Sequence, residues 1–89
     1  MIFTYEEIND ALETMSLPRY ITREDIKNRY RHLAKKLHPD VGGSAEEMER
    51  LNRAYELLVG YIEDFKYSFD EIEIAKQSPI LDHSQRFKP

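Results

Sequence analysis

Apolar residues recur at steps of three and four along most of the chain, the spacing that places side chains on one face of an α-helix. The clearest run has its apolar positions at Ile26, Tyr30, Leu33, Ala34 and Leu37. Pro39 disfavours helical backbone at the residue before it and supplies no amide hydrogen, so we expect this helix to end near Leu37. The pattern therefore predicts a helix over residues 22–37 that runs into a stiff turn at residues 38–43.

Three hydroxyl–acid pairs mark where helices begin. In each pair a Thr or Ser precedes an acidic residue by three positions, the spacing of a capping box, in which both side chains accept hydrogen bonds from free amides. The pairs are Thr4 with Glu7, Thr22 with Asp25, and Ser44 with Glu47. We therefore expect a first helix over residues 5–15 and a third helix that opens at Ser44. Their apolar faces are Ile8, Ala11, Leu12 and Met15, and Met48, Leu51, Ala54, Tyr55 and Leu58.

These elements predict an all-α fold. The second and third helices are joined by a loop short enough to make them antiparallel, and the first helix supplies the third wall of the core. Gly60 interrupts the pattern of the third helix, and the apolar residues after it predict a fourth helical segment that reaches Phe69 or, at most, Ala75. We expect the following side chains at the core or along its edge: Tyr20, Ile21, Tyr55, Tyr61, Phe65 and Phe69.

The chain has 89 residues, room for one small domain without a deep catalytic cleft. We assign residues 1–75 to the helical domain and residues 76–89 to an irregular tail, because the tail contains two prolines and no helical period. Apolar residues in this tail leave open whether it docks on the domain or binds another protein, such as a client; they are Ile80, Leu81 and Phe87. The absence of cysteine excludes disulfides and thiolate metal sites.

Charge is unevenly distributed along the chain. Residues 22–37 contain six Lys or Arg and two acidic residues, a balance of +4, so the remaining residues must carry −8 to give the total of −4. This segregation favours a local attraction to an acidic surface over a general affinity for nucleic acid. The N-terminus has no signal-peptide pattern, and no apolar run approaches the roughly 20 residues that span a bilayer. We therefore expect a soluble, cytoplasmic protein with no membrane contact.

The predicted turn has the sequence His38-Pro39-Asp40 and follows a basic amphipathic helix. This combination resembles the J-domain, the co-chaperone module of the DnaJ family. The resemblance extends to four stretches in family order, at residues 11–18, 22–26, 30–40 and 51–58. It implies a domain that binds a DnaK-type heat-shock chaperone in its ATP-bound state, stimulates its ATP hydrolysis and so traps client polypeptides. It also implies no enzymatic activity, no metal and no cofactor in the domain itself.

The resemblance assigns the partner contact to seven residues: Lys27, Tyr30, Arg31 and His32 on the helix, and His38, Pro39 and Asp40 in the turn. The cations would orient the domain on an acidic trough, and the carboxylate of Asp40 would meet an arginine of the partner. Tyr30 borders the apolar stripe, so its position leaves open whether it packs or contacts the partner. Two features depart from the family pattern. Val41 stands where a basic residue is common, and the region after Gly60 is acidic rather than basic.

Other interpretations explain fewer of these residues. His38-Pro39-Asp40 alone is compatible with a helix-ending turn in which the Asp side chain bonds a nearby amide. A zinc site is disfavoured because His32 and His38 are six positions apart, not the three or four that align ligands on a helix. A DNA-binding helix would lack basic arms for phosphates, and a hydrolase would lack a nucleophile motif. A J-like adaptor that no longer stimulates ATP hydrolysis is the main alternative.

Overall fold

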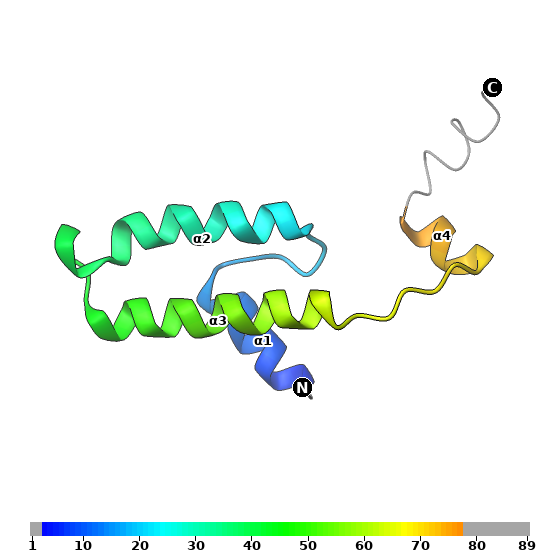
Figure 1. Cartoon of the computed structure of the whole chain (residues 1–89), viewed down its shortest axis with the longest axis horizontal. Coiled ribbons are helices and arrows are strands. Elements are labelled where there is room, and N and C mark those ends of the chain that lie inside the picture. Colours follow the sequence, from blue (N-terminus) through cyan, green and yellow to red (C-terminus); the bar gives the residue numbers. More distant parts are fainter. Residues whose placement is uncertain (1–2, 78–89) are drawn as a thin grey trace, which may run out of the picture.

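Four α-helices follow one another along residues 3–77, the part of the chain that the computed structural model describes. They are α1 (Tyr5–Thr14), α2 (Arg23–Leu37), α3 (Ala45–Glu63) and α4 (Glu71–Gln77), with the 3-10 turn η1 (Pro39–Val41) between α2 and α3. Helices α2 and α3 run side by side in opposite directions, joined at the η1 end, and α1 lies across them (Figure 1). The predicted all-α fold with an antiparallel hairpin is confirmed.

Hydroxyl caps fix the starts of the first three helices, at the positions that the sequence predicts. The amide of the residue three positions into each helix donates to the hydroxyl of Thr4 at 3.1 Å, of Thr22 at 3.1 Å and of Ser44 at 3.0 Å. At the first two caps the acidic side chain also accepts from the backbone amide of the Thr, which completes the capping box. Each cap typically contributes about 1 kcal/mol to the stability of its helix.

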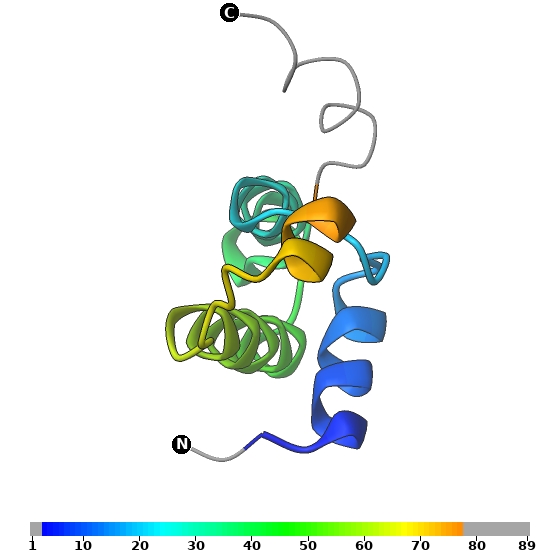
Figure 2. The ribbon, with the colours of Figure 1, turned by 90° about the vertical axis from the view of Figure 1, so that its right-hand side faces the viewer.

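The core lies where α1 and α2 meet α3. Viewed along the hairpin, α2 and α3 are seen end-on and α1 lies against one side of them (Figure 2). Met15 from α1's C-terminal end, Ile26 from α2 and Leu51 from α3 are each no more than 2% exposed. The remaining buried positions are Ala11, Ala54 and Leu58, so the core is built from the predicted apolar faces.

Helix α3 continues through Gly60 and ends at Glu63, which differs from the prediction. Ile62 still packs against the core, and the Glu63 carboxylate pairs with Arg23 of α2 at 2.9 Å. The last turn of α3 therefore contacts both the core and α2. Past Asp64 the helix has no further core surface to cover, and residues 65–69 are not helical. The prediction of a helical segment through Phe69 is therefore wrong, and the fourth helix begins only at Glu71.

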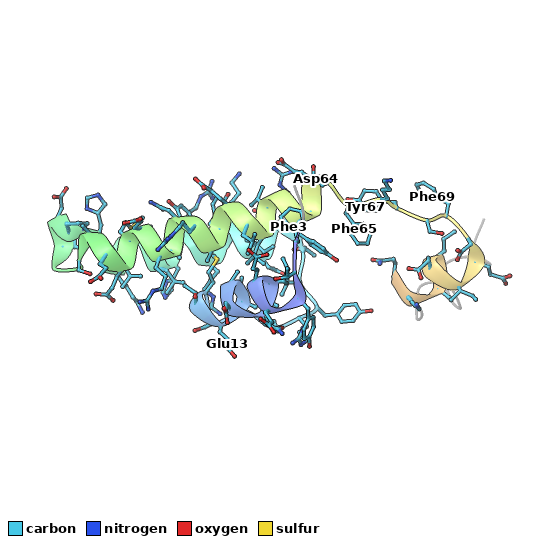
Figure 3. The ribbon with its side chains drawn as sticks, turned by 90° about the horizontal axis from the view of Figure 1, so that it is seen from below. Phe3, Glu13, Asp64, Phe65, Tyr67 and Phe69 are labelled. Carbon is cyan, nitrogen blue, oxygen red and sulfur yellow. The ribbon has the colours of Figure 1, made fainter. Side chains whose placement is uncertain are left out.

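Several aromatic residues that were expected at the core edge are exposed instead. Tyr20 is 82% exposed and Phe69 is 83% exposed, and about half of Phe65 is exposed, whereas Ile21 and Tyr55 do pack against the core. Apolar character alone predicted burial for all of them, but burial requires a facing surface, and α1–α3 offer none to the α3–α4 connection. Helix α4 accordingly stands apart from the other three helices (Figures 1 and 3).

Helix α4 runs to Gln77, two residues beyond the predicted domain end at 75. The predicted irregular tail and its Ile80, Leu81 and Phe87 lie almost entirely outside the described residues, which end at 77. Within residues 3–77, no helix is both long and apolar enough to cross a membrane.

Candidate functional site

Backbone hydrogen bonds hold the corner between α2 and α3, residues 38–43, and one of them runs from the amide of Gly42 to the carbonyl of Pro39 at 3.3 Å. The amide of His38 donates to the carbonyl of Ala34 at 3.1 Å and closes α2. The carbonyl of His38 then accepts from the amides of Val41 and Gly43, both at 3.0 Å. Pro39 occupies the first position of η1, where a missing amide hydrogen costs nothing. The corner is therefore a tight, self-bonded turn rather than a loose loop.

The two glycines of the corner meet different requirements. Gly42 has φ +96°, in the left-handed region that side-chain-bearing residues rarely adopt. Gly43 is in ordinary backbone, but a Cβ there would lie 1.9 Å from the carbonyl oxygen of Leu37. Only a residue without a side chain permits this approach of α3's start to α2's end. The sequence predicted freedom to turn here; the close contact at Gly43 was missed, because no sequence pattern reports it.

His38 and Asp40 have distinct roles within the corner. The Nδ1 atom of His38 accepts a hydrogen bond from the backbone amide of Asp40 at 3.1 Å, so the neutral imidazole carries its hydrogen on Nε2. The Asp40 carboxylate lies 3.6 Å from the same Nδ1 atom, and its side chain is 87% exposed, compared with 50% for His38. In the simple helix-ending turn the Asp side chain would bond the amide. Here the imidazole accepts that hydrogen bond, and the carboxylate is left facing solvent.

A line of cations runs along α2 toward this corner, and we call Lys27, Arg31 and Lys35 the cation line. Their spacing of four residues stacks them on one face of the helix, and all three side chains are exposed. None of them forms an ion pair with a residue of the described range 3–77, whereas Arg23 at the far end of α2 is paired with Glu63. Within the described residues, the three charges of the cation line are therefore exposed to solvent and not neutralised by an ion pair.

His32 lies beside the cation line and borders a shallow groove. The groove has a volume of about 440 Å³ and separates α2 from the connection that follows α1. Its lining residues are Leu17, Pro18, Tyr20, Ile21, Asp25, Asn28, Arg29 and His32. The exposed ring of Tyr20 forms part of it, a residue that the apolar pattern had assigned to the core edge. Within residues 3–77, no three His, Asp or Glu side chains gather as metal ligands.

Tyr30 is occupied by contacts within the hairpin. Its ring stacks on that of Tyr55 with centroids 4.2 Å apart, and its hydroxyl donates to the Oδ1 atom of Asn52 at 2.7 Å. Both partners belong to α3, so the side chain joins the two arms of the hairpin. The sequence left open whether Tyr30 packs or contacts a partner, and these contacts favour packing. Asn52 was missed because a lone polar residue on a helix gives no pairing signal.

Within residues 3–77, the hairpin presents a tightly hydrogen-bonded, exposed corner next to three exposed cations that form no ion pair. The family model of the DnaJ domain matches residues 10–61. The chain belongs to this family, and the match covers α2, the corner, nearly all of α3 and the second half of α1. The predicted resemblance to the J-domain is thus confirmed.

Proteins with similar sequences include several that are named as chaperones or co-chaperones. The chain is 44% identical over 52 residues to the chaperone protein DnaJ of Rippkaea orientalis, and the alignment covers 55% of this chain and 14% of that protein. It is 47% identical over 49 residues to the tetratricopeptide repeat and J domain-containing co-chaperone DNJ1 of Cryptococcus neoformans, with 55% and 9% covered. The similarity thus spans a seventh or less of these relatives. No solved structure matches the chain.

Proposed function

We propose that this protein is a co-chaperone that docks on a DnaK-type heat-shock chaperone in its ATP-bound state and stimulates its ATP hydrolysis, which traps client polypeptides. The observation that carries the proposal is the exposed carboxylate of Asp40, set in a corner that His38 fixes and flanked by the cation line. Membership of the DnaJ domain family and the chaperone relatives support the same role.

The cation line is proposed to guide association. Lys27 and Arg31 are exposed and unpaired within the described range, so their charge acts on an approaching acidic surface. Complementary charge of this kind raises the association rate and fixes orientation more than it adds affinity. His32 and the groove beside it are proposed to extend the contact on the flank facing the α1–α2 connection. We expect salt to weaken the docking, because screening acts on exposed charges.

The corner is proposed to bias the partner rather than to carry out chemistry. Asp40 presents a full negative charge to an arginine of the partner, and Pro39 limits the motion of the turn that bears it. A docked protein changes an equilibrium only if it binds one state of its partner more tightly than the other. In this proposal Asp40 binds better to the state that hydrolyses ATP. The hydrolysis itself belongs to the chaperone, and this chain acts without enzymatic activity, in the cytoplasm.

Single-turnover ATP hydrolysis by a DnaK-type chaperone tests the proposal. We expect the wild-type chain to accelerate hydrolysis and His38→Gln to lose nearly all of that acceleration, because the variant replaces the rigid imidazole that accepts from the Asp40 amide with a longer, flexible side chain. Asp10→Asn, an exposed change on α1, is the control and keeps full acceleration. Circular dichroism must show unchanged helix content, since His38 is outside the core. Equal acceleration by His38→Gln and wild type would refute the proposal.

A second candidate is an adaptor that binds the chaperone without stimulating it. Val41, at the end of η1, is 62% exposed and adds apolar rather than positive character beside the corner. If Val41 weakens the productive contact, the wild-type chain will bind the chaperone without faster hydrolysis, and Val41→Lys will restore acceleration. The same hydrolysis assay, with binding measured in parallel, separates the two candidates.

A further inference from the structure

The end of the hairpin opposite the corner carries a cluster of exposed apolar side chains, which we call the distal patch. It consists of Phe65, Tyr67, Phe69, Ile72 and Ile74. Figure 3 shows Phe65, Tyr67 and Phe69 along the connection that leads from α3 to α4. The most exposed members are Phe69 at 83% and Ile72 at 69%. Single exposed apolar residues are common, but five within ten consecutive residues are typical of an interaction surface.

Side-chain contacts order this patch. Aromatic rings pack edge to face from the start of the chain to the connection, with centroid distances of 5.7 Å for Phe3–Tyr61, 5.7 Å for Tyr61–Phe65 and 5.4 Å for Phe65–Tyr67. Such edge-to-face arrangements are favoured by the charge distribution of aromatic rings. Phe65, Tyr67 and Phe69, together with Ile74 of α4, line a groove of about 330 Å³. The surface is thus partly preformed.

Helix α4 is anchored by a cap of its own. The carboxylate of Asp70 accepts hydrogen bonds from the amide of Glu73 at 2.9 Å and from the hydroxyl of Ser68 at 2.7 Å. These hydrogen bonds, that of the Glu73 amide first, hold the pKa of Asp70 below its usual value. Lys76 pairs with Glu73 at 3.1 Å on the next turn. The short helix therefore begins at a defined residue and carries two exposed isoleucines, of which Ile74 lines the groove.

The border of the distal patch is negatively charged. Residues 61–77 contain five acidic residues, Glu63, Asp64, Asp70, Glu71 and Glu73, against two lysines, a balance of −3. Lys76 pairs with Glu73, and Arg23 of α2 pairs with Glu63, so Asp64, Asp70 and Glu71 remain against Lys66, a balance of −2. A second copy of the chain, packed patch to patch, would bring these like charges together. The charge complement is instead a segment with apolar side chains and Lys or Arg among them.

The connection also offers unpaired backbone. Within the described range 3–77, no backbone hydrogen bond joins residues 66–69 to another segment. Unpaired amides and carbonyls along this stretch are open to hydrogen bonds with a bound peptide, while the neighbouring groove receives its side chains. The unpaired backbone, the apolar side chains and the negative border therefore all suit an extended polypeptide with apolar and basic residues.

We propose that the distal patch binds an extended polypeptide segment in which apolar residues alternate with Lys or Arg. Helix α3, with 19 residues and a length of about 28 Å, separates the patch from the corner. A polypeptide bound at the patch leaves the corner and the cation line accessible. The distal patch shares no residue with the corner or the cation line, so peptide binding there does not depend on the proposed chaperone contact.

Fluorescence anisotropy with the full chain and two labelled dodecapeptides tests this proposal. One peptide alternates Leu or Phe with Lys, and the other has Glu in place of every Lys. We expect the basic peptide to bind at least tenfold more tightly than the acidic one. The double variant Phe69→Ser with Ile72→Gln should lose at least tenfold of that affinity. Tyr20→Ser, which removes an equally exposed aromatic ring from the α1–α2 connection, should retain it.

Three outcomes would overturn the proposal. They are equal binding of the two peptides, no binding of either, and equal losses in the patch variant and in Tyr20→Ser. Sedimentation at the same concentrations addresses a second copy as occupant: a dimer that the patch variant abolishes would assign the patch to self-association instead. ATP hydrolysis by the chaperone separates this site from the corner, since the patch variant should accelerate it as the wild type does.

Discussion

The two ends of the hairpin are stabilised by different means. At the corner, backbone hydrogen bonds, a proline and two glycines fix residues 38–43, and what faces solvent is polar and charged. At the distal patch, ring contacts and one helix cap hold an exposed apolar surface that the core does not cover. The comparison shows that exposure alone does not define a site. At the corner the backbone amide of Asp40 is hydrogen-bonded and its carboxylate is exposed, whereas the patch offers an apolar surface. We therefore expect substitutions at the two ends to have different effects.

The largest effect is expected from Gly43→Ala. The added Cβ would lie 1.9 Å from the Leu37 carbonyl oxygen, so α2 and α3 must move apart at the corner. Forcing extra atoms into a packed position costs about 3 kcal/mol of unfolding free energy at the upper end of the usual range. Urea denaturation measures this loss, and chaperone stimulation should fall with it. Gly42→Asn is the matched control, since Asn tolerates a positive φ. Equal stability of Gly43→Ala and wild type would mean that the corner is not tightly closed.

Charge reversal of the cation line is expected to act next most strongly. Lys27→Glu with Arg31→Glu should slow association with the chaperone by about tenfold at low salt, because steering by exposed charges depends on their field. The difference should shrink near 1 M salt, where the screening length is about 3 Å. Stopped-flow association at the two salt concentrations measures both effects.

The control for the charge reversal is Arg50→Glu with Arg53→Glu, which reverses two exposed cations on α3 and changes the net charge by the same amount. We expect it to leave the association rate close to the wild-type value. A similar decrease in this control would indicate a response to net charge alone, and the cation line would have no special role.

Tyr30→Phe should have a moderate effect on stability and little effect on function. The substitution removes the 2.7 Å hydrogen bond to Asn52 but keeps the stacked ring, so we expect a loss of about 1 kcal/mol in unfolding free energy. Chemical denaturation measures this loss, and the hydrolysis assay should give unchanged stimulation. A large drop in stimulation with little loss of stability would instead place the Tyr30 hydroxyl in the partner contact.

The smallest expected effect is the pH response of α4. The pKa of Asp70 is lowered in the folded chain, so its cap contributes fully above the ordinary aspartate pKa of about 3.9 and is lost as the pH falls through the lower, folded value. The Glu73 amide resonance, followed by NMR, should shift over this acidic range. Asp70→Asn keeps a capping side chain without a titrating group, so its Glu73 amide should not show that transition. An identical pH response in wild type and Asp70→Asn would remove Asp70 as the cause.

The sequence predicted the fold correctly where the apolar positions at helical spacing also face the core. Local sequence determines the helix caps and the end of α2 at Leu37. The capping residues are Thr4, Thr22 and Ser44. The course of the chain after Gly60 was predicted incorrectly, because helical spacing of Tyr61, Phe65 and Phe69 does not reveal whether a surface faces them. Burial is decided by the packing of distant segments, and periodicity reports only the segment itself.

For the candidate site, the sequence predicted a set of residues but not the contacts among them. The motif placed His38 and Asp40 side by side. The hydrogen bond from the Asp40 amide to the imidazole, and the exposure of the carboxylate, depend on the rotamer of His38 and on the turn. The contact of Gly43 with Leu37 likewise follows from the meeting of two helix ends. Such details come from backbone geometry that no residue pattern encodes.

The most direct test of the central claim is a double-mutant cycle of His38→Gln and Asp40→Asn in single-turnover ATP hydrolysis by the chaperone. If His38 acts by fixing Asp40, the double variant should stimulate no less than Asp40→Asn alone, because the two losses share one cause. If the losses instead multiply, each residue makes its own contact with the partner. That result would contradict the account in which His38 positions the Asp40 carboxylate.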